Sequence, residues 1–213
     1  VAQSELPPRS PAGGNTERII SIASRAADFV ALLRAYAGSE PAKPLVEVNL
    51  SEVVRDTLPL LKATVSKNIV FSAVLSEKLP PVRADLSQIR QVILNLLTNA
   101  CEALPNGQGS VHVTTDLVHV ESAQASGHDR DVRPGDYVQL CVTDSGCGIP
   151  VESQSKIFDP FYTTKFLGRG LGLAAVQGIV RNLEGAIRVR SAPGKGSTFR
   201  VLCPSLSRNQ NLE

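Results

Sequence analysis

Apolar residues follow strand-type spacing in some segments and helix-type spacing in others. The order of these segments along the chain constrains its fold more than any other feature. Residues 45–48 have the pattern of a short strand, and a helical pattern runs from Asn49 to about Val65, with Asn49 and Glu52 placed as a capping box. Residues 69–75 then alternate as a strand does. This part of the chain therefore predicts a strand, a helix and a strand in succession.

A second series of elements follows Pro80 and Pro81, two prolines that interrupt regular secondary structure. Its members are a helix over 85–104, strands over 111–120 and 137–143, a helix over 172–183, and closing strands over 186–191 and 198–203. Because an antiparallel run follows the helices, the order favours an α/β (α+β) two-layer sandwich over a doubly wound parallel sheet. We expect a mixed sheet of about five strands packed on three helices.

The chain also divides into segments by composition. Residues 1–15 are rich in proline and glycine, so we expect a flexible linker there, and we expect a flexible tail over 205–213. Residues 16–44 hold one long helix with alternating apolar spacings of four and three, followed by a linker. That spacing suits a helix of a bundle or dimer, and a helix lying on its own domain is the alternative. We expect residues 45–204 to form the main domain.

Composition excludes several classes of protein. Of the 213 residues 42% are hydrophobic and 20% charged, an ordinary globular balance, and the net charge of +2 is too small to favour nucleic acid as a partner. No apolar run is long enough to span a membrane, no signal peptide opens the chain, and the 4 cysteines form no CxxC pair, so we expect a cytoplasmic, reducing location. The chain has no methionine, even at position 1, and we expect it to be part of a longer protein.

Two asparagines mark the first candidate site. Asn95 and Asn99 lie one turn apart on the helix predicted over 85–104, so both amides project from the same face. An amide oxygen is a neutral, hard ligand that suits Mg²⁺. A capping or buried-network role is the alternative for this pair.

The second candidate site is the segment DSGCGIP at residues 144–150. Asp144 follows a predicted strand, and its carboxylate can accept a hydrogen bond from an exocyclic amine. Gly146 and Gly148 leave the backbone free to approach a flat ring. A simple Asp-Gly turn is the alternative.

Glycines at 168, 170 and 172 mark the third candidate site. Gly168, Gly170 and Gly172 run directly into a predicted helix, and successive glycine amides at a helix N-terminus can hold phosphate oxygens. Their spacing differs from the GxGxxG of a dinucleotide fold, and GKGST at 194–198 does not fit a Walker loop. Both familiar phosphate-loop families are thus excluded.

Together these segments resemble the nucleotide-binding boxes of the ATP-binding domain of sensor histidine kinases. The matching segments are QVILNLLTNACEAL at 91–104 for the N box, DSGCGIP at 144–150 for the first glycine box, IFDPFYTTK at 157–165 for the F box, GRGLGLAAVQGIV at 168–180 for the second glycine box, and GKGSTF at 194–199 for the closing glycine box. The resemblance covers roughly residues 45–204, and the preceding helix resembles the second helix of the dimerisation and phosphotransfer hairpin.

The resemblance implies a two-layer fold shared with type II topoisomerases, mismatch-repair ATPases and heat-shock chaperones, with ATP and Mg²⁺ as ligands. It implies that Asn99, assisted by Asn95, binds Mg²⁺. It also implies that Asp144 accepts a hydrogen bond from the adenine amino group. The other nucleotide-binding positions it implies are Gly146, Gly148, Gly168, Gly170, Leu171, Gly172, and Ser197 or Thr198 beside a water, while Phe158 and Phe161 pack the base of a lid. Lys165 and Arg169 are the implied catalytic cations near the phosphates, and solvent-exposed charges of the lid are the alternative for each.

Kinase chemistry is favoured over hydrolysis because Asn95 occupies the place where related ATPases carry a glutamate that activates water. None of His112, His119 and His128 sits in a helical pattern before an acidic residue, so we expect the phosphoacceptor histidine to lie on a helix outside this chain. The implied partners are that hairpin, a response-regulator receiver domain and, in the full protein, a second copy. An ATP-gated regulatory module without phosphotransfer is the alternative, and an anti-sigma Ser/Thr kinase of the same fold fits less well.

Overall fold

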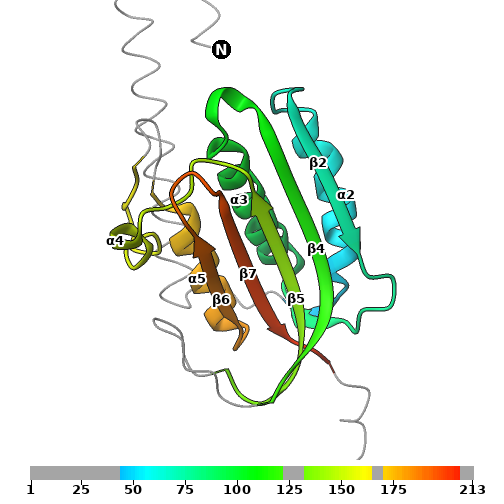
Figure 1. The fold of residues 1–213 in the computed structure, drawn as a ribbon. Coiled ribbons are helices and arrows are strands. Elements are labelled where there is room, and N and C mark those ends of the chain that lie inside the picture. The colour runs from blue at the N-terminus through cyan, green and yellow to red at the C-terminus, as the bar shows by residue number, and fades with distance from the viewer. Residues whose placement is uncertain (1–43, 122–131, 165–169, 207–213) are drawn as a thin grey trace, which may run out of the picture.

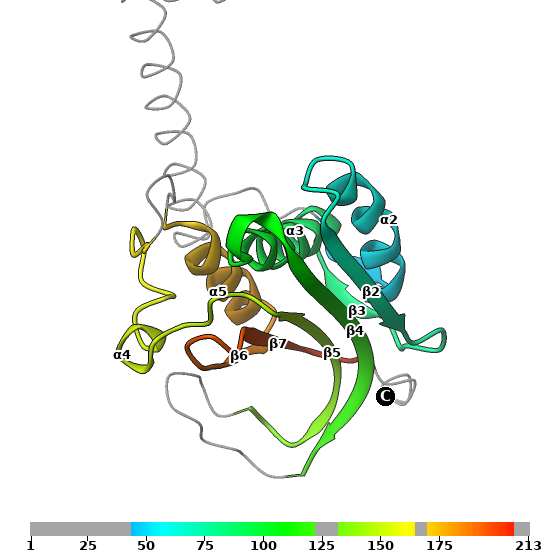
Figure 2. The same ribbon diagram turned by 45° about the horizontal axis from the view of Figure 1, so that its top comes forward.

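The computed structural model describes residues 44–121, 132–164 and 170–206 as two layers, a sheet and a set of helices. Figure 1 looks onto the sheet with α2, α3 and α5 behind it, and Figure 2 shows that these helices cover one face of the sheet. The opposite face carries no described helix. The predicted two-layer sandwich of a mixed five-stranded sheet is confirmed.

The elements follow the order that the sequence predicts, with a few additions. They are β1 (Val46–Val48), α2 (Leu50–Lys62), β2 (Ile69–Leu75), β3 (Val82–Ala84), α3 (Leu86–Glu102), the short 3₁₀ helix η1 (Pro105–Gly107), β4 (Gly109–Val120), β5 (Gly135–Asp144), α4 (Val151–Gln154), α5 (Gly172–Asn182), β6 (Ala186–Ser191) and β7 (Ser197–Pro204). The predictions missed β3, η1 and α4, which have three or four residues each and so show little apolar periodicity, although the equally short β1 was predicted.

The main sheet has the strand order β2-β4-β5-β7-β6, and β1 pairs with β3 in a separate antiparallel ribbon. Only β2 and β4 run parallel within the main sheet, since α3 provides the long crossover that a parallel pair needs. The remaining neighbours are antiparallel. β5 therefore lies in the middle of the sheet, with its C-terminal residue at one end of the helix-covered face.

The core lies between this face and the helices. Ile93, Leu96 and Leu97 of α3 have no exposed surface, and each such side chain contributes about 1.5–3 kcal/mol of transfer free energy. They pack against the inward-facing residues of the central strands, such as Val113 and Leu140. α3 is thereby fixed against the sheet along its length, which positions the asparagines it carries.

Local interactions decide where the helices begin and end. Asn49 caps α2 as predicted, since its Oδ1 accepts from the N–H groups of Ser51 and Glu52 at 3.0 and 3.4 Å. α2 ends at Lys62, three residues before the predicted end. The hydroxyl of Thr64 donates to the carbonyl of Leu61 at 2.9 Å and so satisfies a carbonyl of the last turn.

α3 starts where the sequence predicts but ends earlier. Asp85 is its N-cap and accepts from the N–H of Ser87 at 2.8 Å. The helix ends at Glu102 because Leu104 precedes Pro105, and a residue before proline is pushed into an extended conformation, here φ −78° and ψ 123°.

The predictions for residues 1–15, for the long helix from residue 16 and for most of the tail over 205–213 lie outside the described residues. No helix in the part of the chain that the structure describes has both the length and the apolar character needed to cross a membrane.

Candidate functional site

Asp144 is the last residue of β5 and lies at the centre of the candidate site. It is buried, with 4% of its surface exposed. Its Oδ1 accepts from the backbone N–H of Gly146 at 2.8 Å and of Ser197 at 3.3 Å. Main-chain donors from two segments therefore hold this buried carboxylate in one orientation.

The register of the sheet decides which hydroxyl lies beside Asp144. Ser197 is its direct cross-strand partner, and Ser191 of β6 is in turn the partner of Ser197, so the three side chains form one row on the helix-covered face. Thr198 instead pairs with Thr143, and their hydroxyl oxygens are 3.1 Å apart on the opposite face. Of the two hydroxyls that the sequence left open, the structure brings Ser197 to the carboxylate.

The loop after Asp144 touches the C-terminal end of α3. The N–H of Cys147 donates to the carbonyl of Ala103 at 3.0 Å. A Cβ on Gly146 would lie 2.5 Å from that carbonyl oxygen, so only glycine fits between the loop and the helix. The first glycine box is thereby joined to the helix that carries Asn95 and Asn99.

The same loop also meets the turn between β6 and β7. Gly148 has φ +70°, and a Cβ there would lie 2.0 Å from the carbonyl oxygen of Ala192. The N–H of Gly194 donates to the carbonyl of Cys147 at 2.7 Å. The first and closing glycine boxes, far apart in sequence, are therefore in direct contact.

Asn95 and Asn99 face the N-terminus of α5. The Nδ2 of Asn95 donates to the carbonyl of Gly172 at 3.2 Å. A Cβ on Gly172 would lie 3.7 Å from the Asn95 amide and 3.8 Å from Nδ2 of Asn99. Leu171, the buried N-cap residue of α5, makes no side-chain cap hydrogen bond. Amide oxygens beside a helix N-terminus suit a cation bound together with phosphate.

The carboxylate of Asp144 and the asparagines of α3 lie on the same side of the sheet. Asp144 lies close enough to the end of α3 for its charge to affect the pKa of Cys101. Burial first, and then the charges of Glu102 and Asp144, raise the pKa of the Cys101 thiol from 9.0 to about 11. The two ends of the predicted nucleotide site are therefore built on adjoining parts of the fold.

A backbone hydrogen bond between Phe161 and Gly170 joins the F-box segment to the second glycine box. The N–H of Phe161 donates to the carbonyl of Gly170 at 2.8 Å, and both residues have positive φ, +69° and +64°. Phe158 packs partly against the core, whereas Phe161 is exposed. Lys165, Gly168 and Arg169 lie outside the described residues.

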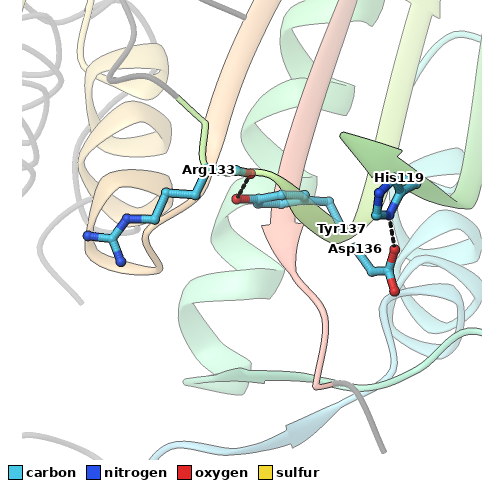
Figure 3. A network of polar contacts seen from close by, with 4 residues as sticks. All are labelled: His119, Arg133, Asp136 and Tyr137. Atoms are coloured by element: carbon cyan, nitrogen blue, oxygen red, sulfur yellow. Dashed lines mark hydrogen bonds and ion pairs between the residues drawn. The ribbon is translucent and has the colours of Figure 1, made fainter. Parts of the chain in front are cut away.

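Both described histidines lie on β4 rather than on a helix. The Nδ1 of His112 is 2.7 Å from the hydroxyl of Ser72. His119 lies near the end of the same strand, within the range predicted as a strand, and pairs with Asp136 at 2.5 Å, as Figure 3 shows. Nearby, the hydroxyl of Tyr137 donates to the carbonyl of Arg133 at 3.0 Å, and burial raises the pKa of Tyr137.

The predictions missed two residues that the structure brings to the site, Ser191 and Gln154. The hydroxyl of Ser191 is 3.0 Å from that of Ser197 and accepts from the N–H of Ile149 at 2.8 Å. The Nε2 of Gln154 donates to the carbonyls of Ile149 and Ser191, at 3.0 Å each. The only sequence signal for Ser191 was a serine at a strand end before a glycine-rich turn.

Known proteins and a known family resemble this chain in sequence. The sequence profile of the family described as histidine kinase-, DNA gyrase B-, and HSP90-like ATPase matches residues 84–207. Among similar proteins, the sensor kinase CckA of Brucella abortus is 40% identical over 186 residues, which are 86% of this chain and 19% of the relative. The sensor histidine kinase ZraS of Salmonella typhimurium is 36% identical over 208 residues, which are 95% of this chain and 41% of the relative. The chain thus spans well under half of these relatives.

Solved structures give the same result. The catalytic domain of the histidine kinase ThkA, in a nucleotide-free form, superposes with a TM-score of 0.61 at 31% identity, covering 76% of this chain and 97% of that domain. ThkA in complex with the response regulator protein TrrA gives a TM-score of 0.67 at 26% identity, covering 98% of this chain and 56% of the other. Full-length ShkA in complex with AMPPNP gives 0.68 at 25% identity, covering 85% of this chain and 35% of the other.

Proposed function

Because this chain belongs to the family of histidine kinase-, DNA gyrase B-, and HSP90-like ATPases, we propose that it is the ATP-binding catalytic part of a two-component sensor histidine kinase. The observation that carries this proposal is the placement of the buried Asp144 carboxylate and the Asn95 and Asn99 amides on one side of the sheet. These groups suit the two ends of one nucleotide, its base and its metal-bound phosphates.

At the base end, Asp144 accepts the adenine amino group. The two main-chain donors on its Oδ1 support this role, because they preorganise the carboxylate before the ligand arrives. Ser197 is the hydroxyl beside it, placed to hold a water next to the base. Gly146 and Gly148 let the surrounding loop approach α3 and the β6–β7 turn closely.

At the phosphate end, Asn99 is the proposed Mg²⁺ ligand and Asn95 assists it. The N-terminus of α5, which begins after Leu171, supports this assignment because its N–H groups and helix dipole favour phosphate oxygens. Gly168, Gly170 and Gly172 extend this phosphate site. Bound Mg²⁺ would neutralise charge on the phosphates, and Lys165 and Arg169 would do the same for the transferring group.

Transfer to a protein histidine is favoured over hydrolysis of ATP. Asn95, whose amide donates to Gly172, cannot deprotonate water as a glutamate could. We propose that the acceptor histidine lies on a helix hairpin outside the described residues, that residues 16–44 supply one helix of a homodimeric bundle, and that a response-regulator receiver domain takes the phosphoryl group. The complex of ThkA with the response regulator TrrA supports this last partner. We also propose a cytoplasmic location.

Titration calorimetry of the 213-residue chain tests nucleotide binding. The titrants are a nonhydrolysable ATP analogue with and without Mg²⁺, and the same analogue of GTP as the control. We expect Mg²⁺-dependent binding that prefers adenine. An absence of binding, or equal binding of both bases, would contradict the proposal.

A second experiment tests phosphotransfer. The chain is incubated with γ-labelled ATP and with the phosphoacceptor hairpin of its own parent protein, and a hairpin with its histidine replaced serves as the control. Acid-labile label on the intact hairpin alone is the expected result. Tight ATP binding without transfer at any hairpin concentration would instead support the regulatory module.

A further inference from the structure

The hydroxyl of Ser191 joins three segments of the chain at the base end of the proposed nucleotide site. It accepts from the N–H of Ile149 in the loop after β5 at 2.8 Å. It donates to the carbonyl of Gly196 in the β6–β7 turn at 2.8 Å, and it lies 3.0 Å from the hydroxyl of Ser197. Ser197 in turn donates its N–H to Asp144.

The hydrogen bonds around Ser191 leave its hydroxyl no capacity for a ligand. A serine hydroxyl has one hydrogen and two lone pairs. Since the carbonyl of Gly196 can only accept, it takes the hydrogen of Ser191, and the lone pairs receive the Ile149 N–H and the Ser197 hydroxyl. Ser191 can therefore influence a nucleotide only through the residues that it holds.

Gln154 of α4 adds two hydrogen bonds to this network, although it is not part of the row formed by Asp144, Ser197 and Ser191. Its side-chain amide donates to the carbonyls of Ile149 and Ser191, at 3.0 Å each, so one NH₂ group spans the loop after β5 and the end of β6. Gln154 is half-buried, and removing it would leave two partly shielded carbonyls without this donor.

We propose that Gln154 and Ser191 together are positioning residues that set the base specificity of the site. They hold the loop after β5 and the β6–β7 turn at a fixed separation, and through Ser197 they fix the place of the Asp144 carboxylate relative to the purine. This rests on the proposed function. It predicts that their loss weakens recognition of the base while leaving recognition of the phosphates intact.

The test compares ATP with inosine triphosphate, which carries an oxygen in place of the adenine amino group. Calorimetry on the 213-residue chain gives both affinities for the wild type and for Gln154→Leu, with Gln108→Leu as the control at an exposed glutamine. Gln154→Leu should lower the ATP-to-inosine-triphosphate affinity ratio about threefold to tenfold, through weaker ATP binding alone. Gln108→Leu should leave the ratio unchanged.

A second pair of variants keeps the test decisive if Gln154→Leu does not fold. Ser191→Ala should lower the same ratio, and Ser191→Thr, which keeps the hydroxyl, should restore it. Ser72→Ala is the matched control, because it removes a serine hydrogen bond on β2 at the far edge of the sheet.

Two results would overturn the positioning role: an unchanged ratio in both Gln154→Leu and Ser191→Ala, or equal weakening of both nucleotides together with a lower Tm. A wild-type chain that binds the two nucleotides equally would contradict the proposed function instead, and it would do so before any variant is made.

Discussion

Ser197 lies directly opposite Asp144 on the neighbouring strand and donates its backbone N–H to Oδ1 of that carboxylate at 3.3 Å. The N–H of Gly146 donates to the same oxygen at 2.8 Å. Because both donors belong to the main chain, the orientation of the Asp144 side chain is set by the sheet and the turn. A substitution of similar shape can therefore change the chemistry of this side chain without moving it.

Asp144→Asn should weaken ATP binding while leaving the fold intact. The asparagine Oδ1 can still accept from Gly146 and Ser197, but the charged acceptor for the adenine amino group is lost. We expect a cost of about 1.5–3 kcal/mol, or roughly tenfold to a hundredfold in Kd, measured by calorimetry. An unchanged Kd would reject Asp144 as the base acceptor.

Asn99→Ala should weaken the dependence of ATP binding on Mg²⁺. The affinity gained by adding Mg²⁺ should fall by about tenfold or more, the size of a lost contact to a charged group. Calorimetry with and without the metal measures it. Asn182→Ala, at an exposed asparagine of α5, is the control and should keep the wild-type response. If Asn99→Ala instead unfolds the chain, Asn99 has a structural role.

Gly148→Ala should destabilise the chain more than Gly194→Ala. Both glycines have nearly the same positive φ, +70° and +71°, so both substitutions carry the left-handed cost of about 1–2 kcal/mol. A Cβ at Gly148 also meets the carbonyl of Ala192 at 2.0 Å, whereas at Gly194 nothing lies within 4 Å. Overpacking should add roughly 1–3 kcal/mol for Gly148→Ala alone. Denaturant unfolding measures both, and equal losses would contradict the close contact.

The cysteines should differ in reactivity. Burial raises the pKa of the Cys203 thiol from 9.0 to about 12, and burial with nearby carboxylates raises that of Cys101 to about 11, whereas Cys147 is exposed. At pH 8 an alkylating reagent should therefore modify Cys147 first, with Cys101 and Cys203 reacting only after unfolding. Mass spectrometry of the peptides follows this order. Equal labelling of the three in the folded chain would contradict it.

The raised pKa values of the Cys101 and Cys203 thiols also predict how the stability of the chain depends on pH. Their folded pKa values lie above the unfolded value of 9.0, so the unfolded chain loses these protons first as pH rises. The stabilising contribution is complete below pH 9.0 and is lost progressively toward the folded values. The free energy of unfolding should therefore decline in this alkaline range, as urea titrations at stepped pH would detect.

Most of the fold could be predicted from the sequence, because the longer elements carry a clear apolar period. α3 and β6 are examples: the stripe through Ile93 and Leu97 marks the helix, and β6 has the predicted bounds. β3 and α4 could not be predicted, because they are short and depend on their neighbours. β3 exists only as the pairing partner of β1.

The candidate site was predictable in part. Asp144, Asn95 and Asn99 stood out because their residue types and spacing suit a nucleotide and its metal. Ser191 and Gln154 did not stand out, since each works through contacts with segments distant in sequence, Ser191 with Ile149 and Gln154 with Ser191.

The sequence by itself determined the order of the elements, the two-layer class and the residue types at each end of the site, since periodicity and side-chain chemistry are local properties. Only the tertiary structure decided that Ser197 and not Thr198 lies beside Asp144, and that the first and closing glycine boxes are in contact. The physical reason is register: neighbours on a strand face opposite sides of the sheet, so pairing between strands determines which side chains meet.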